Sequence, residues 1–292
     1  MKLQYLHTLS VVIAKGSLTA GAQEVNLSTS AVSLQMRQLE EYFRQPLFDR
    51  SGRSIRPTEF ARALAATAER AMGEIEAMRD SRSLSPAGRV RLGITESVEA
   101  TLFPRAYATL RRRTPQIELQ VRRGHTASLL QSIKAGELDI ALLVRPTGGI
   151  TRQLAWSELW RQPFVLVVPR DAQVSTAKAA LRAYPWIRIS RQLITGRLAA
   201  RYVDALIPHC PALVDLENID CAVALVAEGV GVAVLPKLRP ELLDAYPVRE
   251  IALGSSAPTR QLMLVKRRAD EDNRRVLLVE AAFEEAVSAF RA

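Results

Sequence analysis

The chain has 292 residues, a hydrophobic content of 48% and a formal net charge of +10 at pH 7. This length predicts two or three domains, and the apolar content excludes a largely disordered chain. No run of about 18 apolar residues occurs, so we expect no membrane-spanning helix. The N-terminus lacks a signal-peptide core and only two cysteines are present, which predicts a cytoplasmic protein rather than a disulfide-stapled secreted one.

The basic excess is distributed unevenly along the chain. Residues 1–85 carry 11 Lys and Arg against 9 Asp and Glu, so most of the excess lies in residues 86–292. Net charge therefore supports a polyanionic partner only weakly. Local placement is more informative, because Arg50, Arg53 and Arg56 fall within seven residues.

Three helices are predicted in the first 43 residues. Residues 3–14 have one apolar face, residues 18–25 form a short helix, and a longer helix follows a tight turn at Asn26-Leu27, with Ser28 as its N-cap. The buried face of the longer helix is predicted to consist of Val32, Met36, Leu39 and Phe43. Such a pair of helices is typical of a helix-turn-helix, which inserts its second helix in the DNA major groove. The alternative is a helical hairpin of a protein core whose polar face is solvated.

A small hairpin is predicted after the third helix. Pro46 ends that helix, Leu47-Phe48 and Ser54-Ile55 have strand character, and Ser51-Gly52 supplies the turn. Arginines at the tip and flanks would reach phosphates or a minor groove, as in the wing of a winged helix-turn-helix. The alternative is a solvated charged turn, but the preceding helices favour the wing.

A long helix with Thr58 as N-cap is predicted to run to about Arg82. Its narrow apolar seam predicts pairing with a second copy of the chain. The seam consists of Phe60, Leu64, Thr67, Ala71, Ile75 and Met78. Residues 83–88 are predicted to form a linker.

Strands and helices alternate from residue 89 onward. The predicted strands are residues 89–95, 117–122, 138–144, 164–168, 186–189, 231–235 and 261–266. The predicted helices are residues 102–113, 127–135, 176–182, 197–206, 218–228 and 273–290. This alternation predicts open, mostly parallel sheets in two lobes around a cleft. Cys221, on an apolar helix, is expected to be buried and inert.

These segments resemble the LysR-type transcriptional regulators over essentially the whole chain. The N-terminal resemblance is carried by Leu27-Ser28, Ala31-Val32-Ser33, Gln35, Leu39-Glu40-Glu41, Pro46-Leu47-Phe48, Arg50 and Pro57-Thr58-Glu59. The C-terminal resemblance is carried by Phe103-Pro104, residues 136–141 and residues 229–236. The resemblance implies an α/β chain with an N-terminal winged helix-turn-helix, a dimerising linker helix and a two-lobed effector domain like periplasmic binding proteins.

The resemblance also implies domain limits and assembly. We expect a DNA-binding domain at residues 1–58, a linker helix at 59–88 and an effector-binding domain at 89–292. Lobe I of that domain would span about 89–160 and 261–292, and lobe II about 161–260. Members of the family are commonly dimers or tetramers that respond to a small inducer, so a homodimer or homotetramer is expected.

The DNA contacts are predicted at the start of the third helix and in the wing. The candidates are Ser28, Thr29, Ser30, Ser33, Gln35, Arg37, Arg50 and Arg53. By the resemblance, Thr29, Ser30 and Ser33 would contact bases. Gln35, Arg37 and Arg53 would contact the backbone or groove edges. The family often has Gln-Pro where this chain has Thr29-Ser30, and Arg where it has Leu34. Specificity is therefore expected to depend on DNA shape and on the wing.

An effector site is predicted where strands end at the cleft. The candidates are Thr95, Glu96, Ser97, Gly124, His125, Thr126, Val144, Arg145 and Ser190. Helix-start amides at Ser97 and Thr126, together with Arg145, would suit a carboxylate. Glu96 would repel an anion but suit an amino group. The hypothesis is a small effector with a carboxylate, resembling an amino acid.

The leading prediction is therefore a DNA-binding transcriptional regulator controlled by a small effector. The alternative is a non-enzymatic cytoplasmic solute-binding protein whose N-terminal helices oligomerise. An enzyme is not expected, because no arrangement of catalytic groups is found. No cofactor and no metal site are predicted. The predicted partners are double-stranded DNA, the effector and further copies of the chain, with RNA polymerase added if the protein activates, and no membrane.

Overall fold

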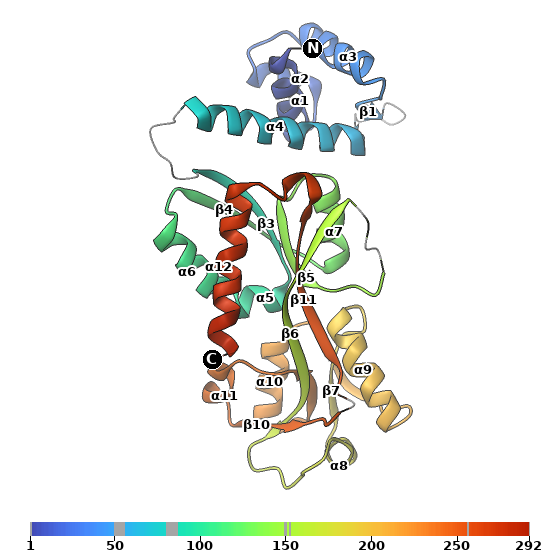
Figure 1. The fold of residues 1–292 in the computed structure, drawn as a ribbon. Helices are drawn as coiled ribbons and strands as arrows, with labels where there is room; N and C mark the ends of the chain where they lie inside the picture. Colours follow the sequence, from blue (N-terminus) through green and yellow to red (C-terminus); the bar gives the residue numbers. More distant parts are fainter. Residues whose placement is uncertain are drawn as a thin grey trace.

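The computed structural model describes residues 2–49, 56–79, 87–148, 151, 153–255 and 257–291. The N-terminal part contains three helices, a short antiparallel strand pair and a long fourth helix (Figure 1). These elements are α1 (Leu3–Lys15), α2 (Leu18–Glu24), α3 (Thr29–Phe43), β1 (Phe48–Asp49), β2 (Arg56–Pro57) and α4 (Glu59–Arg79).

The helix starts follow the predicted capping residues. The Ser28 hydroxyl accepts a hydrogen bond of 3.1 Å from the Ala31 amide, and Thr58 accepts one of the same length from Ala61. Each bond satisfies an amide of the first turn that has no partner within the helix. The predicted apolar stripe of α3 is confirmed, because Val32, Met36 and Leu39 are buried and Phe43 packs against the same core. The buried residues of this core are Leu6, Leu9, Val12, Ala22, Val32, Met36, Leu39, Leu47, Phe48, Ala61, Ala65 and Ala68.

The strand pair after α3 is held by α3 itself. The Glu40 carboxylate accepts a hydrogen bond of 2.8 Å from the Leu47 amide, which fixes the turn that leads into β1. β1 pairs with β2, with Phe48 opposite Pro57. The predicted second strand at Ser54-Ile55 lies outside the described residues, as do the turn and the arginines at positions 50 and 53.

The predicted seam of α4 divides into two parts. Phe60 and Leu64 pack against the N-terminal core. Thr67, Ala71 and Ile75, which follow at spacings of four residues, are exposed. In this second part, Ala71 and Ile75 form an apolar stripe beside Thr67 that the described chain leaves uncovered, and the side chain of Met78 lies outside the described part.

The C-terminal part is built on a seven-stranded mixed sheet with the order β10-β6-β11-β5-β3-β4, to which β9 adds by pairing with β6. Its strands are β3 (Gly88–Ile94), β4 (Ile117–Arg123), β5 (Ile140–Val144), β6 (Leu154–Pro169), β9 (Ala233–Pro236), β10 (Val248–Ala252) and β11 (Thr259–Arg267). A separate parallel pair consists of β7 (Trp186–Ile189) and β8 (Ala212–Leu216).

The sequence prediction of mostly parallel sheets is wrong. β3 pairs in parallel with β4 and β5, but every ladder made by β6 and β11 is antiparallel. β6 is 16 residues long. Its residues 154–163 pair with β11 in one lobe, and residues 164–169 pair with β9 and β10 in the other. A register shift between Leu262 and Met263 marks a bulge in the β11–β6 ladder.

Helices cover the sheets on both sides and divide the domain into two lobes (Figure 1). They are α5 (Glu96–Thr101), α6 (Phe103–Arg113), α7 (Thr126–Lys134), α8 (Ala177–Ala183), α9 (Ile194–Leu206), α10 (Ile219–Ala227), α11 (Pro240–Ala245), a 3-10 turn (Arg268–Asp270) and α12 (Arg274–Arg291). One core gathers around Leu92, Leu142 and Phe283 in the first lobe, and another around Phe164 and Trp186 in the second. Among the described residues, no helix is both long and apolar enough to cross a membrane.

The expectation that Cys221 is buried is wrong. Cys221 is exposed, because it lies in the first turn of α10 while Ala222, Val223 and Val226 face the core. Cys210 is half-buried, and burial together with the negative charge of Asp204 raises the pKa of its thiol. A raised pKa disfavours the reactive thiolate at this position.

Candidate DNA-binding helix and effector cavity

The start of α3 presents short polar side chains to solvent. Ser28, Thr29 and Ser30 are exposed, as is Arg37 two turns later, and the Ser28 and Ser30 hydroxyls are 3.0 Å apart. Their exposure follows from the helical period, since the apolar residues occupy the opposite face. Exposed Leu34 belongs to the same face.

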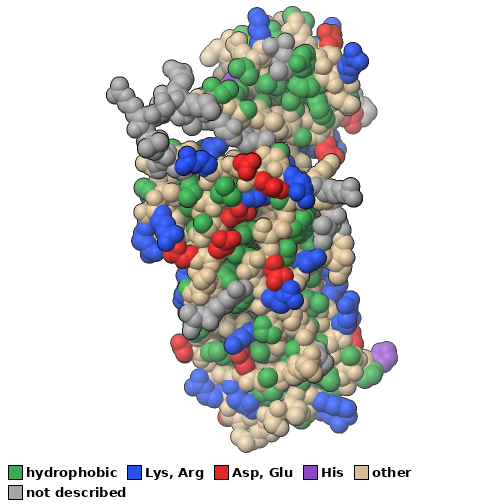
Figure 2. Space-filling view, in the orientation of Figure 1, with side chains coloured by type: hydrophobic (Ala, Val, Ile, Leu, Met, Phe, Trp, Pro, Cys, Tyr) green, Lys and Arg blue, Asp and Glu red, His purple; other side chains and the backbone are tan. Residues whose placement is uncertain are grey.

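Two of the predicted DNA-contacting residues on α3 are only partly accessible. Ser33 and Gln35 are half-buried, and the Gln35 side-chain oxygen is buried without a hydrogen-bond partner in the described part of the chain. Arg50 and Arg53 lie outside the described residues. Figure 2 shows Lys and Arg side chains along the whole length of one face of the molecule, in agreement with a basic excess that is not confined to the N-terminal part.

A cavity of about 1130 Å³ lies between the two lobes. Seven of the nine predicted effector-binding residues line it, namely Thr95, Glu96, Ser97, Gly124, His125, Thr126 and Val144. They converge because the parallel strands β3, β4 and β5 end at the same edge of the sheet. Arg145 and Ser190 are outside this lining: Arg145 donates a hydrogen bond of 3.0 Å to Gln261, and the Ser190 hydroxyl accepts one from the Gln192 amide.

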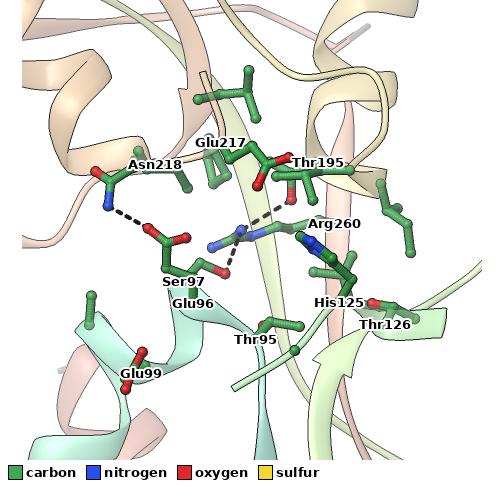
Figure 3. Close-up of a pocket in the computed structure, with 18 of the residues that line it drawn as sticks. Thr95, Glu96, Ser97, Glu99, His125, Thr126, Thr195, Glu217, Asn218 and Arg260 are labelled. Carbon is green, nitrogen blue, oxygen red and sulfur yellow. Dashed lines mark hydrogen bonds between the residues drawn. The ribbon is translucent and has the colours of Figure 1, made fainter. Parts of the chain in front are cut away.

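The most distinctive residue of the cavity is Arg260, which the sequence reasoning missed. It lies on β11 and is 2% exposed. Its Nε donates to Gln162 at 2.8 Å. Its Nη1 donates to Ser97 at 3.2 Å and to Thr195 at 3.3 Å (Figure 3). All three acceptors are neutral. None of the described carboxylates forms an ion pair with Arg260.

Burial has a large effect on this guanidinium. Desolvation lowers the pKa of Arg260 to about 9, so the side chain still carries its charge at neutral pH. A buried charge without a counter-ion is costly, and an anion placed next to it removes much of that cost. The signal in the sequence was the two-residue period of the strand, since Arg260 shares a face with the buried Leu262 and Leu264.

A contact across the cavity joins the two lobes. The amide of Asn218, the N-cap of α10, donates a hydrogen bond to the carboxylate of Glu96, the first residue of α5 (Figure 3). Nearer the outside, Arg105 of α6 forms an ion pair of 3.0 Å with Glu241 of α11. Both contacts link elements that lie far apart in the chain, and they hold the lobes together over the cavity.

Several other charges around the cavity are already matched. Arg239 pairs with Asp220 at 2.6 Å, and Arg123 lies 3.8 Å from Glu99. Arg197 donates hydrogen bonds to the backbone carbonyls of residues 191 and 192. Arg260 differs from these cations in two ways: it is almost fully buried, and no described carboxylate pairs with it.

Comparison with known families covers both parts of the chain. Residues 3–62 match the family described as bacterial regulatory helix-turn-helix protein, lysR family, and residues 83–288 match the LysR substrate binding domain. The regulator YfeR of Shigella flexneri is 27% identical over 280 residues, which is 91% of this chain and 88% of that protein. The regulator IlvY of Escherichia coli is 24% identical over 279 residues, covering 93% and 90%.

Solved structures of full-length regulators have the same fold. LysG from Corynebacterium glutamicum with bound effector Arg has a TM-score of 0.74 at 19% identity and covers 99% of both chains. A full-length variant of OxyR from Pseudomonas aeruginosa has a TM-score of 0.69 at 19% identity, covering 97% of this chain and 94% of that one. The chain belongs to the LysR family of transcriptional regulators, with an N-terminal DNA-binding domain followed by a two-lobed effector-binding domain.

Proposed function

We propose that this regulator responds to a small effector whose carboxylate pairs with Arg260. The supporting observation is the buried, charged guanidinium, whose hydrogen bonds go only to neutral groups of the described chain. A carboxylate accepts charge-assisted hydrogen bonds from a guanidinium, and burial strengthens them. The lining residues Thr95, Ser97 and Thr126 offer further hydrogen-bonding groups for the same ligand.

On the DNA side, the exposed start of α3 would enter the major groove. Thr29, Ser30 and Ser33 would contact bases, and Gln35, Arg37, Arg50 and Arg53 would contact the backbone or groove edges, with Ser28 at the helix start. Short hydroxyl side chains make few bidentate contacts with bases, so sequence-dependent DNA shape would supply much of the specificity.

For assembly, we infer a homodimer, or a homotetramer, built on α4. The exposed stripe of Thr67, Ala71 and Ile75 supports this inference, because a partner helix would cover it.

The expected domain limits are residues 1–58, 59–88 and 89–292. The regulator would act in the cytoplasm, where its DNA target lies, with no catalytic step of its own. RNA polymerase becomes a further partner if the regulator activates.

The coupling between effector and DNA would be mechanical. An effector that binds between the lobes changes their relative orientation, the lobes displace α4, and the spacing of the two recognition helices in the dimer changes. Such coupling requires that the effector binds one arrangement of the lobes more tightly than the other.

Calorimetry on the full chain tests the carboxylate site. The probes are a panel of amino acids, simple carboxylic acids, amines and neutral analogues, titrated into the wild type and into Arg260→Gln. We expect carboxylates to bind the wild type and to lose at least about tenfold in affinity with Arg260→Gln. Arg145→Gln is the matched control, because this arginine is outside the cavity lining. Binding confined to neutral or purely cationic probes would contradict the proposal.

A gel-shift assay tests the DNA-binding helix. Ser33→Arg places a long cation on the groove face and should abolish specific binding while leaving the oligomeric state unchanged. Specific binding should also weaken steeply as salt concentration rises, since phosphate contacts release counterions. Unchanged specific binding by Ser33→Arg would exclude this face of α3 from the interface.

A further inference from the structure

The cavity contains a second, oppositely charged feature next to Arg260. We propose that the effector is dipolar: its carboxylate binds Arg260, and a cationic group of the same molecule binds between Glu217 and Glu96. An amino acid is the simplest member of this class. The inference rests on the carboxylate site proposed above, to which it adds the second charge of the ligand.

Glu217 is the first half of this cation site. It follows β8, directly before the N-cap of α10, and its side chain lines the cavity. No described residue forms an ion pair or a hydrogen bond with its carboxylate. Two further acidic residues line the cavity, and both are paired: Glu99 with Arg123, and Asp220 with Arg239. Glu217 is exposed, and it offers the cavity a negative charge that the described chain does not balance.

Glu96 is the second half, and it comes from the opposite lobe. Its carboxylate accepts a hydrogen bond from the Asn218 amide, which is neutral and leaves the negative charge in place. Because Asn218 follows Glu217 in the chain, this bond joins Glu96 to the segment that carries Glu217. In Figure 3 the side chains of Glu96 and Glu217 extend toward the space that the Arg260 guanidinium reaches.

The charges favour one ligand with both signs over an ion of either sign. Glu96 and Glu217 line the same cavity, and a cation bound there is attracted by both carboxylates. A purely anionic ligand would satisfy Arg260 but would face both glutamates. A purely cationic ligand would satisfy the glutamates and leave the buried guanidinium unpaired. A dipolar ligand satisfies both ends at once.

A dicarboxylate is the competing occupant, because Lys134 and Lys237 also line the cavity. Both lysines are exposed, and neither ammonium forms an ion pair with a described residue. An exposed side chain keeps its hydration and gains little from a counter-charge, which holds for both lysines and for Glu217. Glu96 is half-buried and gains more from a bound cation. Half-buried Glu96, with Glu217 on the opposite lobe, therefore favours a ligand that carries a cation as well as the carboxylate.

Calorimetry of the full chain with each of the twenty common amino acids tests the proposal. Each amino acid that binds is then compared with its analogue lacking the amino group and with the amine lacking the carboxylate. We expect both analogues to bind at least about tenfold more weakly, because each leaves one buried or paired charge unsatisfied. Failure of all twenty amino acids, or equal binding of the analogue without the amino group, overturns the dipolar effector.

Glu217→Gln separates the two ends of the ligand. The variant keeps the shape of the side chain and should lower affinity for the amino acid about tenfold, while the analogue without the amino group binds unchanged or more tightly. Glu228→Gln is the matched control, because it removes the same charge from an exposed position of the same lobe outside the cavity.

The same experiments distinguish failure of this inference from failure of the proposed carboxylate site. If a carboxylate or dicarboxylate binds with an affinity that depends on Arg260 but not on Glu217, only the inference of a dipolar effector is overturned. Ligands whose affinity is the same in the wild type and Arg260→Gln overturn both.

Discussion

A Cβ atom added to Gly136 would lie 3.0 Å from the Cβ atom of Ala66. Ala66 belongs to α4 and Gly136 to the turn that follows α7, so this is a direct contact between the linker helix and the effector domain. α7 begins at Thr126 in the cavity lining and ends at this turn. One short helix therefore connects the effector cavity with the helix that is proposed to carry the dimer.

Replacement of Gly136 by alanine should loosen this contact. Gly136 has a φ of +74°, so alanine is strained there, and its Cβ would in addition press on Ala66. We expect Gly136→Ala to destabilise the chain and to speed hydrogen exchange of the α4 amides. Hydrogen exchange followed by mass spectrometry measures both effects.

Gly229→Ala is the control for Gly136→Ala. Gly229 has nearly the same φ, +72°, but nothing lies within 4 Å of an added Cβ. It should show the backbone strain alone, about 1 kcal/mol, with no change in α4. Equal behaviour of the two variants would mean that the Ala66 contact contributes nothing.

Arg260 predicts a pH dependence of effector binding. The protonated guanidinium binds the carboxylate, and burial lowers the pKa of Arg260 to about 9. Affinity should therefore be constant below about pH 8 and fall as the pH rises through about 9. Calorimetry with a binding carboxylate across this range checks the fall, and an affinity that stays constant to about pH 10 would contradict it.

Without ligand, the effect of Arg260 on stability has the opposite sign. The unfolded chain keeps the proton of Arg260 to a higher pH than the folded chain, so above about pH 9 the unfolded state binds more protons. The free energy of unfolding therefore rises with pH in this range. Relative to Arg260→Gln, the unliganded wild type should therefore become more stable between about pH 8 and about pH 10 in thermal denaturation.

Asp139 should be among the most sensitive charged residues for stability. Its carboxylate accepts hydrogen bonds from the Arg91 amide at 2.8 Å and from Arg91 Nη2 at 2.7 Å, and the Arg91 and Asp139 side chains are only 21% and 12% exposed. Asp139→Ala leaves a mostly buried arginine unpaired and should cost about 3 kcal/mol. Urea denaturation measures the loss.

Glu118→Ala is the contrasting variant for Asp139→Ala. Glu118 pairs with Arg89 across the neighbouring strands β3 and β4, but both side chains are more than half exposed. Its removal should cost less than about 1 kcal/mol. Similar losses for the two variants would refute the dependence on burial.

Ile75 tests the proposed dimer. Ile75→Asp places a charge in the exposed stripe of α4 and should raise the fraction of monomer in sedimentation velocity. Binding to an operator with two half-sites should weaken accordingly. Leu277→Asp, at an exposed apolar position of α12, is the control. A dimer unaffected by Ile75→Asp would exclude this stripe from the interface.

Local signals in the sequence predicted the elements well where they were strong. Ser28 and Thr58 were predicted as N-caps and a helix was predicted from Thr176, and all three hydroxyls cap their helices. The short elements α11, β8 and β10 were not predicted, whereas the short strands β7 and β9 were, because apolar residues dominate these two strands. The direction of strands was also missed, since it is set by which strands pair and not by local pattern.

The candidate site could be predicted only where a strand ended in a visible polar segment. That rule indicated Thr95 to Ser97 and Gly124 to Thr126, all of which line the cavity. It could not indicate Arg260 or Asn218, because these residues come to the cavity only when segments far apart in the sequence pack together. It also indicated Arg145, whose side chain is held by Gln261 outside the lining.

β6 gives the two lobes a common backbone. Since one strand runs through both, a bend or twist of that strand would change the orientation of one lobe relative to the other. The bulge at Leu262 and Met263 lies in the ladder beside it, close to Arg260 in the chain, and bulges are where ladders bend. A ligand bound to Arg260 would thus act close to the place where the strands bend. Its effect would reach the DNA-binding domain as a change of angle between the lobes rather than as a change of distance.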